Sequence, residues 1–181
     1  MSNLNLEWLS RNLRPDAIIF DIGAADMNDT RRMKAVFPNA TFYAFECARS
    51  WEVHNKQVAA EHKINYYHMA VSNRNGNLTF YPSAVLDGQE WPWSGSVCEP
   101  GPNLINERWQ WGEGYTVPSI TLETFCSVHN VSPDFIHIDV QGAELDVLMG
   151  ATKTLENCKD LLIDLQDIEY NIGGPLKNQV I

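Results

Sequence analysis

Residues 134–150 join an alternating strand pattern, an acidic turn and the first turns of an amphipathic helix. The first part alternates two faces up to Asp139, and the second repeats apolar residues from Leu145 to Met149 at spacings of three and four. In an open α/β sheet, ligands bind at the carboxyl ends of the strands. Asp139 closes such a strand, so we expect it to belong to a functional site.

A second segment of the same kind lies upstream at residues 17–29, where four apolar residues run into Asp21. Gly23 follows, and glycine permits a close backbone approach or a positive φ angle. A helix through Val36 comes next, for which the alternative N-caps are Asp26, Asn28 and Asp29.

A further strand at 40–46 ends in Glu46, 25 residues after Asp21. A strand, a glycine turn, a helix and a second strand that ends in a carboxylate form the nucleotide-binding half of a doubly wound fold. Such a carboxylate can accept hydrogen bonds from both ribose hydroxyls of an adenosine. The sequence therefore predicts an adenosine-containing ligand beside Glu46.

Together these segments resemble the FkbM-type family of S-adenosylmethionine-dependent methyltransferases. The family pattern runs Asp-x-Gly-Ala-Asn-x-Gly, Ala-Phe-Glu-Pro, Ala-x-Ser, Thr-Leu-Asp and Lys-x-Asp-x-Glu-Gly-x-Glu. Its motifs recur here in order, within roughly residues 17–166, as Asp21-Ile22-Gly23-Ala24, Ala44-Phe45-Glu46, Ala70-Val71-Ser72, Thr121-Leu122-Glu123 and Asp139-Val140-Gln141-Gly142-Ala143-Glu144.

The resemblance implies a Rossmann-like, doubly wound, mostly parallel α/β sheet and S-adenosylmethionine as the cofactor. Asp21, Gly23 and Ala24 would meet the methionine part of this donor, and Glu46 its ribose. The turn that contains His68 and Ala70 would lie against the adenine, although His68 is equally typical of a packed or solvated histidine.

Three residues are candidates for catalysis. Asp139 would orient the acceptor or take its proton. His137, on the same strand face, would relay that proton or simply pair with Asp139. Glu144 lies in the first turn of the following helix, where a negative charge is stabilised by the helix dipole, so a structural role is as good an interpretation as an active-site role.

Five departures from the family pattern bear on the candidate site. His137 replaces a lysine and Gln141 a glutamate, a balanced change that predicts that the two positions face each other. The loss of a carboxylate at Gln141 also argues against a metal ion. The other departures lie in the two upstream motifs, at Ala25, Met27 and Cys47.

The length of 181 residues fits one domain with a sizeable core, residues 1–181, in which residues from about 82 to 118 form an aromatic-rich loop insertion. The net charge of -10 argues against a nucleic-acid partner. No apolar run approaches the ~20 residues that a membrane helix needs. The four scattered cysteines are typical of reduced thiols, so we expect a cytoplasmic location.

Strands and helices alternate along most of the chain, which predicts parallel pairing. Helices are expected near 3–13 and at 28–37, 48–61, 121–129 and 142–156. Strands are expected at 17–21, 40–46, 64–68, 78–82, 134–139 and 160–166, with an Asn-Gly hairpin turn at 73–77.

The insertion holds four of the six tryptophans. It is interpreted as a lid or wall of the acceptor site, with Ser94, Gly95 and Ser96 near the substrate, or as a cover for the sheet edge. Beyond 160–166 the sequence lacks the helix and antiparallel hairpin of the family. This predicts either a truncated C-terminus or a homo-oligomer that covers the edge.

These expectations converge on O-methylation of a hydroxyl of a sugar, a glycan or another small metabolite. The main alternative is a methyltransferase-like binding or scaffolding domain that has lost catalysis, which Met27 and Gln141 favour. A carbohydrate-binding module would have only the tryptophan-rich insertion in its support. A nicotinamide-dependent oxidoreductase is disfavoured, because the first turn lacks the G-x-G-x-x-G spacing.

Overall fold

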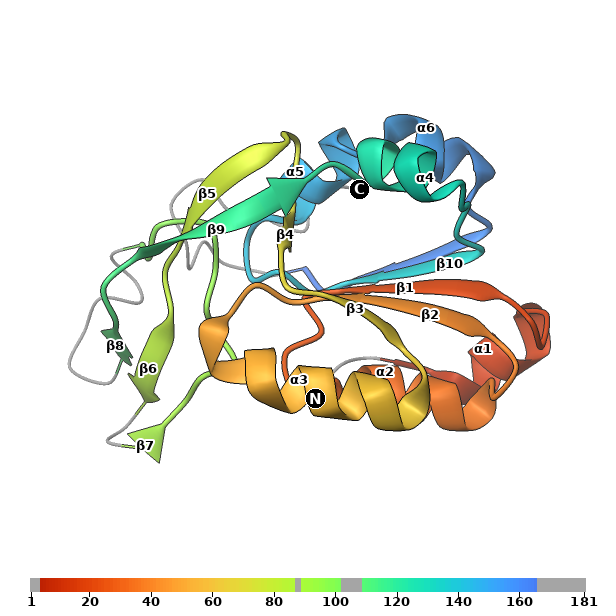
Figure 1. Cartoon of the computed structure of the whole chain (residues 1–181), viewed down its shortest axis with the longest axis horizontal. Helices are drawn as coiled ribbons and strands as arrows, with labels where there is room; N and C mark the ends of the chain where they lie inside the picture. Colours follow the sequence, from red (N-terminus) through yellow and green to blue (C-terminus); the bar gives the residue numbers. More distant parts are fainter. Residues whose placement is uncertain (1–3, 87–88, 102–108, 166–181) are drawn as a thin grey trace.

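The computed structural model describes residues 4–86, 89–101 and 109–165. At its centre lies a sheet of five strands: β1 (Ile18–Ile22), β2 (Thr41–Phe45), β3 (Asn65–Tyr67), β10 (Phe135–Ile138) and β11 (Asp160–Ile163). All neighbouring pairs are parallel, in the order β11-β10-β1-β2-β3, with helices on both faces (Figure 1). This confirms the Rossmann-like, doubly wound fold.

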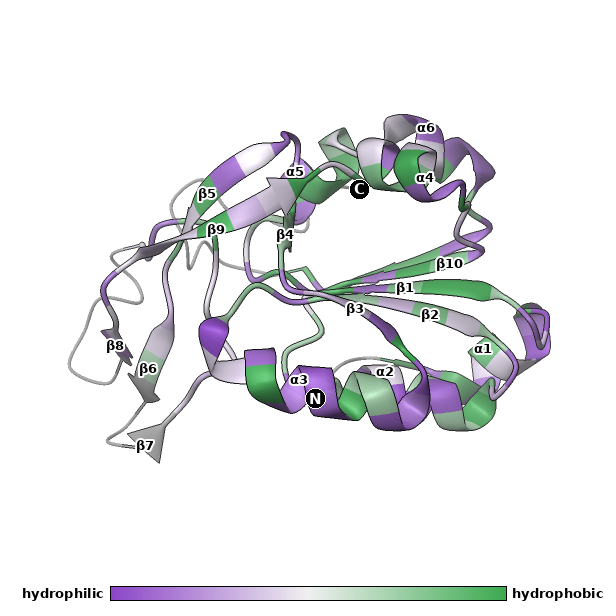
Figure 2. Cartoon of the chain, viewed as in Figure 1, coloured by the Kyte–Doolittle hydropathy of each residue, from purple (hydrophilic) through white to green (hydrophobic). Residues whose placement is uncertain are grey.

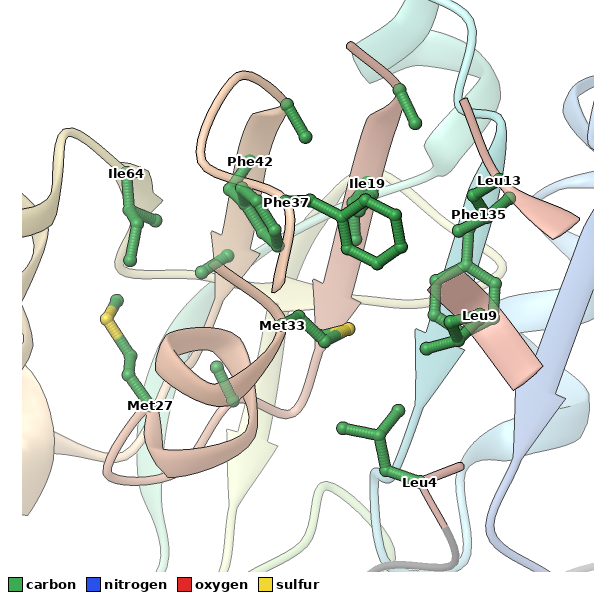
Figure 3. Close-up of a cluster of buried hydrophobic side chains, with 14 of the residues drawn as sticks. Leu4, Leu9, Leu13, Ile19, Met27, Met33, Phe37, Phe42, Ile64 and Phe135 are labelled. Carbon is green, nitrogen blue, oxygen red and sulfur yellow. The ribbon is translucent and has the colours of Figure 1, made fainter. Parts of the chain in front are cut away.

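One face of the sheet is covered by α1 (Leu6–Asn12), α2 (Asn28–Val36) and α3 (Arg49–His62). Because side chains alternate along a strand, every second residue of β1, β2 and β10 points toward these helices. Ile19, Phe42 and Phe135 therefore meet Leu9 of α1 and Met33 of α2 in one buried cluster (Figure 3).

The opposite face is covered by α4 (Leu122–His129), α5 (Glu144–Met149) and α6 (Thr152–Asn157). The ring of Phe125 lies 5.7 Å from that of Phe20 and 4.8 Å from those of Phe45 and Tyr67. Hydrophobic residues accordingly line β1 and β10 between the two helical layers (Figure 2).

The single helix expected at 142–156 is wrong, because α5 and α6 are separate helices. Gly150 lies between them, and a Cβ atom at this position would come within 2.2 Å of the Ser72 carbonyl oxygen. This close approach of two distant segments ends α5, and helical periodicity carries no signal of it.

The expectation of an irregular insertion at about 82–118 is also wrong, because strands run through it. β9 (Tyr115–Ile120) lies between β4 (Ala70–Val71) and β5 (Gly76–Phe80), while β6 (Ser83–Leu86) lies between β7 (Gln89–Glu90) and β8 (Trp109–Trp111). Pro118 makes β9 difficult to predict from the sequence, because proline has no N–H to donate to a neighbouring strand and therefore argues against a strand. In the structure Pro118 stands opposite Asn77 of β5.

The strand order reverses direction between β1 and β10, and ligands of doubly wound folds bind at such a point. The two carboxyl ends are held together there by a hydrogen bond of 2.9 Å from the Asp139 N–H to the Ile22 carbonyl. Gly23 has a φ of +84°, and a Cβ atom on it would lie 1.9 Å from the Asp139 carbonyl oxygen. Only glycine fits this position.

None of the helices in the described part of the chain is both long enough and apolar enough to cross a membrane. The C-terminal continuation after β11, on which the expectation of a missing hairpin rests, lies outside the described residues.

We expect Gly23→Ala to destabilise the chain by more than about 4 kcal/mol, because the new methyl group would overlap the backbone of Asp139. The matched control is Gly76→Ala, where φ is +129° but no atom lies within 4 Å of the new Cβ, so only strain of about 1–3 kcal/mol is expected. Urea unfolding of both variants measures the difference. Equal losses would contradict the close approach at the sheet edge.

Candidate active site

The loop after β1 contains two non-glycine residues in the left-handed region, Ala25 with φ 43° and Met27 with φ 57°. The family pattern places asparagine and glycine here, the two residues that enter this region most readily. Met27 compensates by burying its side chain completely in the core. It is also the N-cap residue of α2, without a side-chain cap bond, so the expected cap at Asp26, Asn28 or Asp29 is wrong.

Asp26 instead closes a turn before the helix. Its Oδ1 atom accepts a hydrogen bond of 3.1 Å from the N–H of Asn28. The helix therefore begins where the buried Met27 fixes the backbone. A search of the sequence for residues that typically cap helices does not detect this start.

Glu46 fixes the loop from the side of β2. Its carboxylate accepts the backbone N–H of Ala25 at 2.8 Å and that of Ala48 at 2.7 Å. Ala25 is also held by Asn55 of α3, whose side-chain amide donates a hydrogen bond of 2.7 Å to the Ala25 carbonyl. Burial raises the pKa of Glu46, against the opposing effect of these backbone N–H groups.

Asp21 and His137 form a buried pair across the β1–β10 register. The His137 Nδ1 atom lies 2.9 Å from Asp21 Oδ1, and Thr30 Oγ1 donates to Asp21 Oδ2. Burial disfavours the charged ring, but the hydrogen bond to Asp21 and the charges of Asp21 and Asp139 raise the pKa of His137 overall. Its Nε2 atom is buried without a hydrogen-bond partner among the described residues.

The expected pairing of His137 with Asp139 is therefore replaced by pairing with Asp21. Gln141 Nε2 donates to Asp139 Oδ1, so the two substituted family positions bind different carboxylates and do not hydrogen-bond each other. Burial raises the pKa of Asp139 to about 6, and the nearby Asp164 acts in the same direction.

Two adjoining cavities open at these strand ends. The apolar cavity, of about 70 Å³, extends over the turn after β3. The acidic cavity, of about 430 Å³, lies over the loop after β1 and the start of α2. Both are lined by Gly23, Ala25, Trp93, Asp139 and Gln141.

The apolar cavity is completed by Ile22, Phe45, Glu46, Cys47, Met69, Ala70, Val71, Phe80, Gly95, Ser96, Val97 and Val140. The acidic cavity is completed by Asp21, Ala24, Asp26, Asn28, Asp29, Trp91, Ser94, His137 and Asp164. The structure thus brings together most of the candidate residues chosen from the sequence.

Two candidates line neither cavity. His68 contacts the Tyr66 hydroxyl at 3.2 Å and Glu52 at 3.7 Å, beside a separate surface hollow. Both carboxylate oxygens of Glu144 accept the N–H of Gly142 at 3.0 Å, and the side chain is buried.

Sequence reasoning did not single out Thr30, Asn55 or Asp164 as site residues. Thr30 and Asn55 lie on helices whose sequence pattern is that of ordinary amphipathic helices, so nothing in the sequence marks them as site residues. Trp93 belongs to the segment singled out for its tryptophans, whereas Asp164 follows the last strand in the way that Asp139 follows β10. That strand-end position was the available signal for Asp164.

Comparisons with known proteins agree with this fold. The methyltransferase FkbM domain matches residues 21–176. The 2-O-methyltransferase NoeI of Sinorhizobium fredii is 33% identical over 164 residues, which are 88% of this chain and 68% of NoeI. The crystal structure of a methyltransferase FkbM from Methylobacillus flagellatus KT shares the fold, with a TM-score of 0.56 and 15% identity over 85% of this chain. This chain spans 34% of that larger protein. By the extent of the domain match and the identity to NoeI, the chain belongs to the FkbM family of methyltransferases.

Proposed function

We propose that the protein uses S-adenosylmethionine to methylate a hydroxyl of a sugar, a glycan or a similar small metabolite. The observation that carries the proposal is the position of two carboxylates, the buried Glu46 and the half-buried Asp139, on either side of the Gly23 loop at the point where the sheet reverses. The name of the relative NoeI, a 2-O-methyltransferase, supports oxygen as the methylated atom.

The apolar cavity suits the adenosine of the donor. Glu46 would bind the ribose hydroxyls, since each carboxylate oxygen accepts one backbone N–H and retains capacity for a second bond. Met69, Ala70 and Val71 offer an apolar wall for the adenine. His68 lies outside this cavity, so we assign it no contact with the donor.

The methionine end would extend past Gly23 and Ala24 toward the first turn of α2. A helix N-terminus attracts a carboxylate, and Asn28 and Asp29 of this turn line the acidic cavity. Asp21 binds Thr30 through one carboxylate oxygen and His137 through the other, so we assign it the role of holding the His137 ring beside the site.

When bound, S-adenosylmethionine supplies an electrophilic methyl group and leaves as a thioether. As the acceptor oxygen forms its bond to carbon, its proton must be removed. Asp139 lines both cavities, and a base with a pKa of about 6 is well matched to neutral pH. Glu144 binds the Gly142 N–H and would hold the turn that follows Asp139.

A binding domain without catalysis is the second candidate. The specific observation in its favour is the small apolar cavity, about 70 Å³, compared with the roughly 300–1,000 Å³ of typical ligand sites. Trp93, Ser96 and Val97 narrow it, and the Ser96 hydroxyl lies 3.5 Å from the Val140 carbonyl. Under the methyltransferase proposal this segment moves outward when the donor enters.

Calorimetric titration with S-adenosylhomocysteine tests the donor site. We expect micromolar binding by the wild-type chain and a loss of about 100-fold in Glu46→Ala, because two bonds to a charged group are worth about 3 kcal/mol or more. Glu61→Ala is the control, since this exposed acid of α3 lines neither cavity. Because Glu46 also holds two backbone amides, the thermal unfolding of each variant is measured in parallel. If the folded wild-type chain does not bind S-adenosylhomocysteine, the second candidate, a methyltransferase-like domain without catalysis, is favoured.

The effect of Asp139→Asn on stability tests the burial of this carboxylate. The pKa of Asp139 is raised from 3.8 to about 6, so its ionised form destabilises the folded state above pH 6. We expect the variant to be more stable than wild type at pH 7.5, by at most about 3 kcal/mol. The gain should shrink as the pH falls through 6 and vanish below 3.8, where the acid is protonated in both states. Chemical unfolding at several pH values measures it, and a gain independent of pH would contradict the assigned environment.

The same Asp139→Asn variant should lose methyl transfer by about 100-fold or more while it retains affinity for S-adenosylhomocysteine. Transfer of a labelled methyl group to neutral sugar acceptors provides the assay. The wild-type rate should rise with pH through about 6 as Asp139 ionises. Unchanged turnover in the variant would exclude Asp139 as the proton acceptor.

A further inference from the structure

Two tryptophans, Trp91 and Trp93, form part of the wall of the acidic cavity. The ring centroids of Trp91 and Trp93 are 5.2 Å apart, and Trp93 lies 5.5 Å from Trp51 of α3. Trp91 is held in place because its Nε1 atom donates to Ser94 Oγ at 3.1 Å. Trp91 remains 39% exposed and Trp93 43% exposed. Fixed aromatic surface that stays open to solvent inside a cavity is typical of a binding site.

The remaining wall is strongly acidic. Five aspartates line the cavity, and its described lining contains no lysine or arginine. The basic side chain in this described lining is His137, and it is paired with Asp21. In the part of the chain that the structure describes, no three metal-ligating side chains converge to hold a metal ion. Away from the start of α2, an anionic group beside Asp139 and Asp164 would therefore meet repulsion, while hydroxyl groups would find carboxylate acceptors.

A second feature points to a ligand that donates or accepts hydrogen bonds. His137 lines the cavity and is 3% exposed, and its buried Nε2 atom has no hydrogen-bond partner among the described residues. Leaving a buried polar atom unpaired costs free energy, which a polar ligand group can recover.

We propose that the side of the acidic cavity lined by Trp91, Trp93, Asp139 and Asp164 is the acceptor subsite, and that it takes an uncharged sugar ring and excludes anionic sugars. The inference rests on the proposed function and adds the charge class of the acceptor. The C–H face of the ring would lie on Trp93 and Trp91, because an aromatic face buries apolar surface well. Its hydroxyls would donate to Asp139 and Asp164, which line the same cavity.

The position of Trp93 and Asp139 links this subsite to the reaction. Both residues line the acidic and the apolar cavity. A ring that lies on Trp93 with a hydroxyl at Asp139 therefore presents that oxygen where the two cavities meet, which is where the donor methyl group would be under the proposed function. A neutral ring adds no charge to the aspartates, whereas a carboxylate on the ring would approach Asp164.

Saturation-transfer NMR with matched probes tests this subsite. The probes are the methyl pyranosides of glucose, galactose and mannose, each compared with its C6 uronate, at millimolar concentration in the presence of S-adenosylhomocysteine. We expect at least one neutral glycoside to bind, with affinity at least ten times that of its uronate. Binding should fall at least ten-fold in Trp93→Ala and be unchanged in Trp8→Ala, a control in α1 whose ring is 45% exposed.

Asp164→Asn is a second variant, outside the packed core. It should reduce the difference in affinity between a neutral glycoside and its uronate. The inference is overturned if uronates bind as well as neutral glycosides, if Trp93→Ala leaves binding intact, or if no probe binds while S-adenosylhomocysteine does. In that last case the methyltransferase proposal stands. Failure of S-adenosylhomocysteine to bind overturns the proposed function itself, whatever the glycosides do.

Discussion

The contact between the loop after β1 and the end of β10 is the constraint on which the rest of the site depends. Gly23 lies against the Asp139 carbonyl so closely that no side chain fits between them. This contact places the proposed donor half of the sheet and the proposed acceptor half side by side at the reversal of strand order. The cavities, the shared lining and the position of Asp139 all follow from it.

The loop itself is strained and is held by its neighbours. Ala25 and Met27 have left-handed conformations at the positions where the family pattern has asparagine and glycine. Glu46, Asn55 and the complete burial of Met27 compensate for this strain. The chain can therefore depart from the family pattern and keep the loop geometry. Glu46 therefore has a structural role, since it accepts a hydrogen bond from the Ala25 N–H, in addition to its proposed contact with the ribose.

Local pattern predicted the elements that are amphipathic and continuous. The strands near Asp21, Glu46 and Asp139, and the helices that follow the first two, lie within a few residues of their expected bounds. Elements defined by distant contacts were not predicted. Gly150 separates two helices because it contacts Ser72, and Pro118 stands in a strand because Asn77 lies opposite it. Neither contact leaves a periodic signal in its own segment.

The sequence by itself determined that carboxylates end two strands on either side of a glycine turn, because strand and turn propensities act over a few residues. Only the tertiary structure decided the partners of these side chains. The register of β1 against β10 sets Asp21 opposite His137, so the histidine binds this residue and leaves Asp139 to Gln141. Register is a property of two paired strands, and a single segment cannot encode it alone.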